Sequence, residues 1–282
     1  MRERLFFPVL TKWLGHKGNP AVSISEDLGY RVGPRLPSSY RTVMIMSHFF
    51  DFLTYRKPSW HFVGDSHING FRRAYEQKLI RRRCTFTEVG GATAVGLRNP
   101  NSVTNAVDTF KKALLPKSRN TTPVIQLGEV DCGFVIWYRA KKYGESVEGQ
   151  FRQSITAYTA FVDELLLYGY NKIVLTGATV PTIVDDQDWG EVANARREVT
   201  STIQDRTELT LKYNAELQDA ARRRSLPFID LSGLVLDKET GLVSAYFRNP
   251  DPTDHHLDPD KVAPLWATEL NRIDAMISTE KS

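Results

Sequence analysis

The sequence predicts a three-layer α/β/α sandwich around a parallel β-sheet of about five strands. Short apolar runs alternate with longer segments in which apolar residues recur at helical spacing. Polar or glycine residues follow each apolar run. Strands separated by helices form right-handed βαβ units, and their helices cover both faces of a parallel sheet.

The first two predicted pairs of strand and helix span residues 60–115, from the apolar run WHFVGD to the leucine pair at 114–115. We expect a strand at 60–65, a helix at 66–80, a strand at 84–91 and a helix at 101–115. The apolar residues of both helices lie on one face. Asn101 or the serine after it could cap the second helix, because both side chains accept backbone N–H groups well.

The remaining predicted elements continue the alternation. A strand at 123–131 precedes a long amphipathic helix at 146–169, which ends on a glycine. A fourth strand occupies 171–178. Two predicted helices, at 196–224 and 259–276, then flank a fifth strand, PFIDLSGLV at 227–235.

Composition and the distribution of glycine and proline predict the domain organisation. Residues 1–58 are rich in glycine and proline, so we expect a loop-rich N-terminal extension packed on a main α/β domain at 59–282. A hydrophobic content of 41% suffices for a sizeable core. Only two cysteines occur, which excludes a disulfide framework.

Charge and hydropathy restrict the partners. The net charge of +4 is mild, and we expect no nucleic-acid partner. No apolar stretch is long enough to span a bilayer, and the N-terminus lacks a small-residue cleavage site. We therefore expect a cytoplasmic protein without a membrane span, and we expect neither a cofactor nor a bound metal.

The candidate site lies at one edge of the predicted sheet. Ligands of open parallel sheets bind outside the carboxyl ends of the strands. The loops there gather polar and glycine residues, at 64–67, 90–93, 128–131, 179–189 and 251–260. A site built from several of these loops is the natural expectation.

Ser66 follows the first strand in the segment GDSH. At the first turn of a helix its hydroxyl lies near unpaired backbone N–H groups, which also favour developing negative charge. A serine hydroxyl is a weak nucleophile, however, and needs a base. Ser66 as a simple helix N-cap is the alternative, and so is a metal site that includes Asp65 and His67.

The distant loop DPTDHHLDPD supplies the missing base. It holds a carboxylate, Asp254, directly before His255 and His256. An imidazole can take the proton of a serine, and a carboxylate can hold that imidazole in the required tautomer. A solvated acidic helix start would explain Asp258 and Asp260, but not two adjacent histidines in a chain with six.

Four motifs in this order resemble those of the SGNH/GDSL hydrolase superfamily. They are GDSH at 64–67, GGATAVGL at 90–97, LGEVD at 127–131 and TDHHL at 253–257. The resemblance covers about 60–277. It implies a flavodoxin-like fold, Ser66 as nucleophile, and an oxyanion hole formed by the backbone N–H groups of Ser66 and Gly91.

Two positions depart from the family pattern. Val130 replaces the asparagine whose side-chain amide completes the oxyanion hole, and Glu129, Asn69 and Arg139 are the candidate substitutes. Thr253 stands three residues before His256, where the family has aspartate. We therefore predict His256 as the base with Asp254 orienting it, and keep His255 as the alternative base and Asp251 as the alternative carboxylate. The candidate supporting residues are Asp65, Asn69, Glu129, Asp131, His255 and Asp251.

The leading functional hypothesis is a serine-dependent ester hydrolase without a cofactor. The resemblance implies a small-molecule or carbohydrate acyl ester as substrate, and Trp137, Tyr138 and Trp189 could present an aromatic face to a sugar. A non-catalytic binding protein with the same fold is one alternative, since the family asparagine is missing. A metal-dependent phosphoesterase is the other; its candidate ligands are Asp65, His67, Asp131, Asp254, His255 and Asp258.

Overall fold

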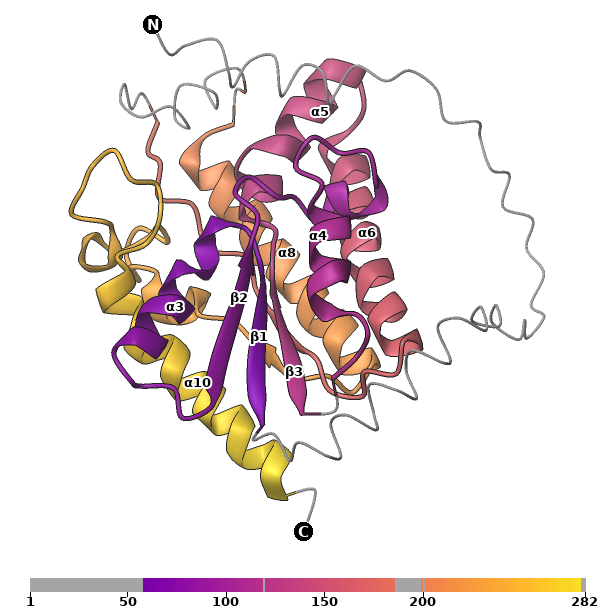
Figure 1. The fold of residues 1–282 in the computed structure, drawn as a ribbon. Coiled ribbons are helices and arrows are strands. Elements are labelled where there is room, and N and C mark those ends of the chain that lie inside the picture. The colour runs from indigo at the N-terminus through magenta and orange to yellow at the C-terminus, as the bar shows by residue number, and fades with distance from the viewer. Residues whose placement is uncertain (1–57, 119, 186–198, 200, 280–282) are drawn as a thin grey trace, which may run out of the picture.

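The computed structural model describes residues 58–118, 120–185, 199 and 201–279 (Figure 1). Its sheet has five strands in the order β2-β1-β3-β4-β5, and all neighbouring pairs are parallel. The strands are β1 (Ser59–Gly64), β2 (Arg83–Glu88), β3 (Thr121–Gln126), β4 (Val174–Thr176) and β5 (Phe228–Ile229). This is the strand order of flavodoxin-like folds, and it confirms the predicted fold class.

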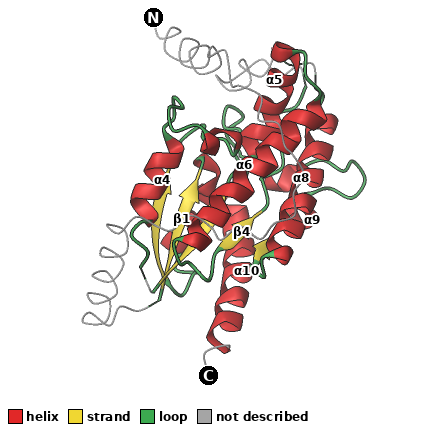
Figure 2. Ribbon diagram, turned by 90° about the vertical axis from the view of Figure 1, so that its right-hand side faces the viewer, coloured by secondary structure: helices red, strands yellow, loops and turns green. Residues whose placement is uncertain are grey.

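Helices cover both faces of the sheet. One face carries α4 (Ala106–Leu114), α6 (Val147–Leu167) and α8 (Ile203–Arg223), and the other carries α3 (Asn69–Glu76), α9 (Ser232–Val235) and α10 (Pro259–Thr279). Figures 1 and 2 show the strands enclosed between these layers. The remaining helical elements are η1 (Ser66–Ile68), η2 (Val95–Arg98), the π-helix η3 (Asp131–Val135), α5 (Ile136–Tyr143) and η4 (Ala245–Phe247).

Successive side chains of each central strand point to opposite faces of the sheet and pack in different parts of the core. Val63, Ile125 and Leu175 pack with the α4, α6 and α8 layer. Their immediate neighbours Phe62, Val124 and Val174 pack with the α3 and α10 layer. All six are fully buried, as expected where helices cover both faces of a sheet.

The C-terminal helix is held against the helix that follows β1. The Phe71 ring lies 4.1 Å from the Trp266 ring, between centroids, and Gly70 of α3 lets the indole approach. At the other end of this contact, Asp260 accepts hydrogen bonds from Arg73 Nε at 2.6 Å and Gln77 Nε2 at 2.7 Å. Because α10 directly follows the loop at 249–258, this packing places that loop beside the end of β1.

Two predicted helices are shorter than expected. The helix expected at 66–80 ends at Glu76, and Lys78 has a positive φ of 61°. The helix expected at 101–115 begins only at Ala106, after Asn105 in the left-handed conformation. Capping by Asn101 or the serine after it was therefore a wrong prediction.

Four predicted strands run too long, and the helices η3, α5 and α9 were not predicted. The second strand ends at Glu88, and the fourth occupies only Val174–Thr176. The third strand ends at Gln126, and the chain then forms η3 and α5. The fifth strand ends at Ile229, because Asp230 Oδ1 accepts the N–H and hydroxyl of Ser232, at 2.9 and 2.6 Å, and turns the chain into α9. An apolar run alone does not distinguish a buried strand from a buried helical turn.

The predicted extension at 1–58 lies outside the described residues except for residue 58. The predicted helix at 196–224 is described as a helix from Ile203 onward, and most of its first residues lie outside the described part.

Candidate active site

Ser66 stands at the carboxyl end of β1, where two backbones approach closely. A Cβ on Gly64 would lie 2.2 Å from the carbonyl oxygen of Gln126 in β3, so only glycine fits there. The next residue, Asp65, caps η1 by accepting the backbone N–H of His67 at 2.9 Å. The alternative that Ser66 is itself the N-cap is thereby wrong, and its hydroxyl is available for another partner.

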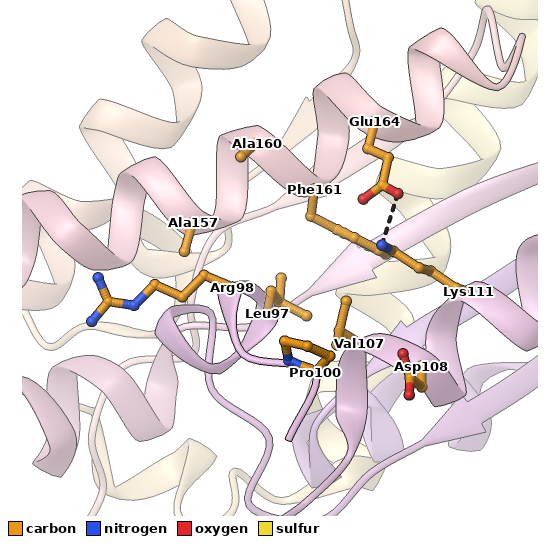
Figure 3. A pocket seen from close by; sticks show the side chains of 10 residues that line it. All are labelled: Leu97, Arg98, Pro100, Val107, Asp108, Lys111, Ala157, Ala160, Phe161 and Glu164. Carbon is orange, nitrogen blue, oxygen red and sulfur yellow. Dashed lines mark ion pairs between the residues drawn. The ribbon is translucent and has the colours of Figure 1, made fainter. Parts of the chain in front are cut away.

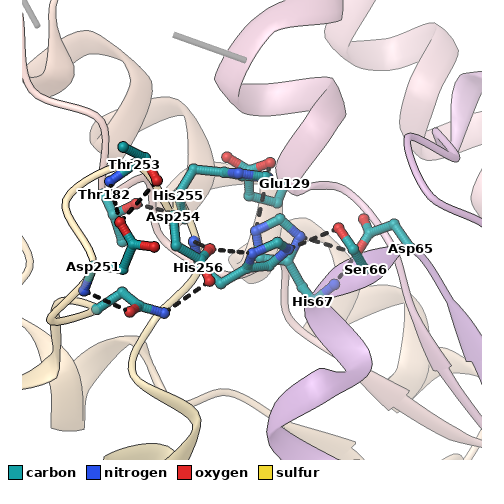
Figure 4. A network of polar contacts seen from close by, with 11 residues as sticks. Asp65, Ser66, His67, Glu129, Thr182, Asp251, Thr253, Asp254, His255 and His256 are labelled. Atoms are coloured by element: carbon teal, nitrogen blue, oxygen red, sulfur yellow. Dashed lines mark hydrogen bonds and ion pairs between the residues drawn. The ribbon is translucent and has the colours of Figure 1, made fainter. Parts of the chain in front are cut away.

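That partner is His256. Its Nε2 lies 2.8 Å from Ser66 Oγ, across 190 positions of sequence. Its Nδ1 lies 2.5 Å from Asp254 Oδ1, which also accepts the backbone N–H of His256 at 2.9 Å. The second oxygen of Asp254 accepts a hydrogen bond from Asn249 Nδ2 at 2.9 Å. The structure therefore places serine, imidazole and carboxylate in one continuous chain of contacts (Figure 4).

The surroundings set the charge state of this pair. Burial lowers the pKa of His256, and the neighbouring His67 lowers it further, against the opposing effects of Asp254 and Glu129. Burial alone would raise the pKa of Asp254, but the hydrogen bonds and charge of His256 bring it below the usual value. A neutral imidazole next to an ionised carboxylate is the state in which a histidine can accept the proton of serine.

The alternative base and carboxylate lie elsewhere in the loop. Asp251 is exposed and accepts the N–H and hydroxyl of Thr253, at 2.8 and 2.7 Å. The backbone oxygen of His255 accepts the Thr182 hydroxyl at 2.5 Å, and its ring lies 4.1 Å from that of His256, between centroids. His256 contacts Ser66 directly, and Asp254 is connected to Ser66 through His256.

His67 directly follows Ser66 in η1, and its ring is almost fully buried. Its Nδ1 is 3.1 Å from Asp65 Oδ1, and its Nε2 is 3.7 Å from Glu129 Oε2. The Glu129 side chain is 2% exposed, so this carboxyl group lies inside the site. The side chain of the neighbouring Val130 instead packs on the apolar cluster of Val95, Phe134, Val135 and Val199.

Asp131 holds neighbouring segments together through hydrogen bonds to its buried carboxyl group. Its two oxygens accept the backbone N–H groups of Ala94 at 2.7 Å and Val95 at 3.0 Å, and Oδ1 also accepts the Ser154 hydroxyl at 2.7 Å. Burial raises its pKa, against the opposing effect of these hydrogen bonds. Asp131 thus ties the loop after β2 to the start of η3 and to α6.

The other predicted site residues occupy separate positions. Gly91 lies in the exposed turn after β2 with a φ of 69°, at the same edge of the sheet as Ser66. The backbone N–H of Asn69 donates to the Ser66 carbonyl oxygen. Arg139 Nε donates to Gln150 at 2.6 Å, so its guanidinium is engaged with α6.

The aromatic residues offered for sugar binding fit a packing role. Trp137 Nε1 donates to the Cys132 carbonyl oxygen at 2.7 Å, and its ring packs on two apolar clusters. Tyr138 stacks near Phe134, with 5.3 Å between ring centroids. Trp189 lies outside the described residues.

A separate pocket of about 300 Å³ lies between η2, α4 and α6 (Figure 3). The Lys111–Glu164 ion pair, at 2.7 Å, lies in its wall beside Phe161. Its lining contains neither serine, histidine nor cysteine. The pocket therefore does not belong to the chain of contacts around Ser66.

Several partners at the site could not be identified from sequence. Thr182 and Ser154 contact site residues that are 73 and 23 positions away, and nothing in their local pattern marks them. The contact of Asn249 could have been predicted, because Asn249 lies five residues before Asp254 in the same loop.

Within the described residues, no helix is long and apolar enough to cross a membrane.

No family model matches the sequence, and no curated protein matches it. Solved structures do. A protein from Streptococcus pneumonia, whose name refers to platelet activating factor, is 12% identical with a TM-score of 0.50, over 83% of this chain and 92% of that chain. A GDSL-like lipase from Bacteroides thetaiotaomicron is 14% identical with a TM-score of 0.49, over 83% and 98%. A carbohydrate acetylesterase from Sinorhizobium meliloti is 13% identical with a TM-score of 0.45, over 78% and 100%.

These likenesses concern the fold. The likeness with a TM-score of 0.50 agrees with the five parallel strands in flavodoxin-like order, which is the fold that the motifs implied.

Proposed function

We propose that this protein is a serine-dependent hydrolase of acyl esters. Ser66 is the nucleophile, His256 the general base and Asp254 the carboxylate that orients the base. One observation carries the proposal: Nε2 of His256 lies 2.8 Å from Ser66 Oγ while its Nδ1 lies 2.5 Å from Asp254. A serine and a base within hydrogen-bond reach, with the base held by a third group, form the arrangement that activates a hydroxyl.

The reaction proceeds in two halves. Ser66 Oγ attacks the carbonyl carbon of the ester while its proton passes to Nε2 of His256, and the alcohol then leaves with that proton. Water next gives a proton to Nε2 and attacks the acyl-enzyme, which releases the acid and restores the serine. Throughout, Asp254 holds the Nδ1–H and stabilises the imidazolium.

The oxyanion of each tetrahedral intermediate is bound by the backbone N–H groups of Ser66 and Gly91. Val130 packs in an apolar cluster and Arg139 is bonded to α6, so Glu129 and Asn69 remain as the candidates for the missing donor. One oxyanion donor contributes roughly 3 kcal/mol of transition-state stabilisation.

The substrate class is an acyl ester of a small molecule or a carbohydrate. Trp137 uses its indole N–H inside the protein, which removes one support for a sugar-binding aromatic face. A simple activated ester such as p-nitrophenyl acetate is therefore the suitable first substrate, because it requires little beyond the acyl site.

Fluorophosphonate labelling with hydrolysis of p-nitrophenyl acetate tests the proposal. Labelling should map to Ser66, and Ser66→Ala should abolish it and lower turnover at least about 10³-fold. The matched control is Ser278→Ala, because Ser278 is exposed on α10 and its hydroxyl donates to Asp274 of the same helix. Its rate should equal that of the wild type.

The alternatives give different results in the same assay. A non-catalytic binding protein shows neither labelling nor turnover across a panel of esters, which would sink the proposal. A metal-dependent phosphoesterase cleaves phosphodiesters and loses activity in a chelator. Contacts speak against the second alternative, because Asp131 holds two backbone N–H groups and Asp258 accepts the N–H of Asp260 at 2.9 Å.

A further inference from the structure

Three histidine rings meet at the carboxyl edge of the sheet. His67 comes from η1, and His255 and His256 come from the loop before α10. One ring nitrogen from each lies within 4.8 Å of the others. Three imidazoles at one point are a donor set suited to zinc and similar divalent cations.

We propose that His67, His255 and His256 bind a zinc ion, and that the bound ion switches off hydrolysis by taking the imidazole nitrogen that Ser66 needs. The binding site stands on the geometry of the histidines alone. The switch, in contrast, rests on the proposed hydrolase function.

Two of the three histidines are already oriented as metal ligands usually are. Nδ1 of His67 lies 3.1 Å from Asp65 Oδ1, and Nδ1 of His256 lies 2.5 Å from Asp254 Oδ1. A carboxylate on one ring nitrogen fixes the tautomer, orients the ring and makes the other nitrogen a better ligand. Because the carboxylate contacts Nδ1 in both residues, Nε2 would be the ligand nitrogen of each.

The surroundings compensate the charge of a dication. Glu129 Oε2 lies 3.7 Å from Nε2 of His67, and the side chains of these two residues are only 2% and 3% exposed. Carboxyl groups of Asp65, Glu129 and Asp254 thus lie against the histidines on several sides. Glu129 could also supply an oxygen ligand at the fourth position of a tetrahedral site.

Zinc binding and serine activation exclude each other. Nε2 of a neutral His256 has one lone pair, which either accepts the Ser66 hydroxyl, 2.8 Å away, or binds the ion. Zn–N bonds of about 2.0–2.1 Å bring tetrahedral ligands to about 3.3 Å from one another, so the ring nitrogens, which lie within 4.8 Å of one another, must move closer together. In the zinc form Ser66 keeps its proton and has no base.

Zinc binding is measured by equilibrium dialysis of the full chain after removal of metal with a chelator. His255→Gln removes one ligand but keeps the backbone contact to Thr182. The matched control is His61→Gln, because His61 lies in β1 and its ring contacts Thr87 Oγ1 at 2.9 Å. We expect one zinc ion on the wild type and the control, and at least about tenfold weaker binding to His255→Gln. Equal affinity of wild type and His255→Gln would overturn the site.

The switch is measured by titrating zinc into the p-nitrophenyl acetate assay, with each variant compared with its own rate in chelator. Saturating zinc should lower the wild-type and His61→Gln rates at least tenfold, and should affect His255→Gln only at correspondingly higher concentrations. A rate that is unchanged or raised by zinc refutes the switch.

Failure of the hydrolase proposal can be separated from failure of the metal site. Without turnover in chelator, the hydrolase proposal and the switch both fall, while dialysis still decides the site. Ser66→Ala provides a further check in dialysis. It should bind zinc at least as tightly as the wild type, because the competing hydroxyl is gone; weaker binding would contradict the competition.

Discussion

At the scale of single residues, the different contacts of Asp65 and Ser66 determine which side chain faces His256. Asp65 accepts the backbone N–H that a helix-capping serine would have taken. The Ser66 hydroxyl therefore bonds to His256 instead. Asp65 thus meets the structural requirement of a helix start, while Ser66 keeps its hydroxyl for the proposed role of nucleophile.

Replacing Asp254 tests the proposed orientation of the base. In Asp254→Asn the side chain can present an N–H to Nδ1 of His256, which favours the tautomer with its proton on Nε2. That tautomer cannot accept the serine proton, so we expect kcat/KM for p-nitrophenyl acetate to fall roughly 10³-fold with little change in folding.

The matched control for this substitution is Asp251→Asn. Asp251 is the other carboxylate that the sequence offered, and it bonds within its own turn to Thr253. Its variant should stay within about twofold of the wild-type rate. A larger loss in Asp251→Asn than in Asp254→Asn would reverse the assignment.

The sequence motifs predicted Ser66 and His256 as site residues. They did not predict the contacts that position these two side chains. The choice between Asp254 and Asp251 depended on a loop conformation that spacing does not specify. Glu129 was considered only as an oxyanion donor, whereas the turn after β3 directs its carboxyl group toward His67 and Val130 toward an apolar cluster. Which of two adjacent side chains enters a site is set by backbone geometry at a strand end.

At the scale of elements, β1, η1 and α3 form a rigid support for the serine. The support depends on the approach of β1 to β3 at Gly64, where any Cβ would also meet Ile68 Cγ2 at 2.7 Å. On the far side, α10 packs on α3 through Trp266 and Phe71. The serine and the histidine are therefore held by elements that contact each other directly.

Gly64→Ala should damage both stability and activity. The added methyl group meets a backbone carbonyl oxygen, which cannot move without shifting β3, so we expect at least about 2 kcal/mol lower free energy of unfolding. The displaced Ser66 should also lower turnover. Urea denaturation and the ester assay measure the two effects.

The control is Gly233→Ala, because nothing lies within 4 Å of a Cβ at this exposed position of α9. Alanine is favoured over glycine in a helix by up to about 1 kcal/mol, so this variant should be as stable as the wild type or slightly more stable. Equal losses in the two variants would show that the contact at Gly64 is unimportant.

Element boundaries were predicted less well than element types. The alternation of apolar runs with helical patterns suffices for the parallel sheet, because it repeats five times. It fails where a short side chain turns the chain within an apolar run, as Asp230 does between β5 and α9. It also fails at η3 and α5, which continue the apolar run after β3.

At the scale of the whole molecule, the described core consists of two large apolar clusters on the two faces of the sheet. These clusters enclose the five strands between the two helix layers. Because residues 1–58 are rich in glycine and proline, we propose that the α/β domain at 59–282 is a folding unit and that residues 1–58 are an extension of it.

A chain truncated to begin at Ser59 tests this division, and the two cysteines report the result. Burial raises the pKa of Cys84 to about 12 and that of Cys132 well above its usual value. Thiolate is the reactive form, so both thiols should resist iodoacetamide at pH 8 in the folded chain and react quickly in urea. Rapid labelling of the truncated chain without urea would show that it does not fold alone.

The packing of α10 on α3 has a consequence for the time at which the proposed active site is completed during synthesis. Ser66 is synthesised early, but its proposed base is the last part of the site to be made and becomes fixed only when α10 docks. Chains interrupted before that helix can form much of the sheet and still be inert toward esters. Ester hydrolysis by nascent chains stalled at increasing lengths should therefore appear late and abruptly.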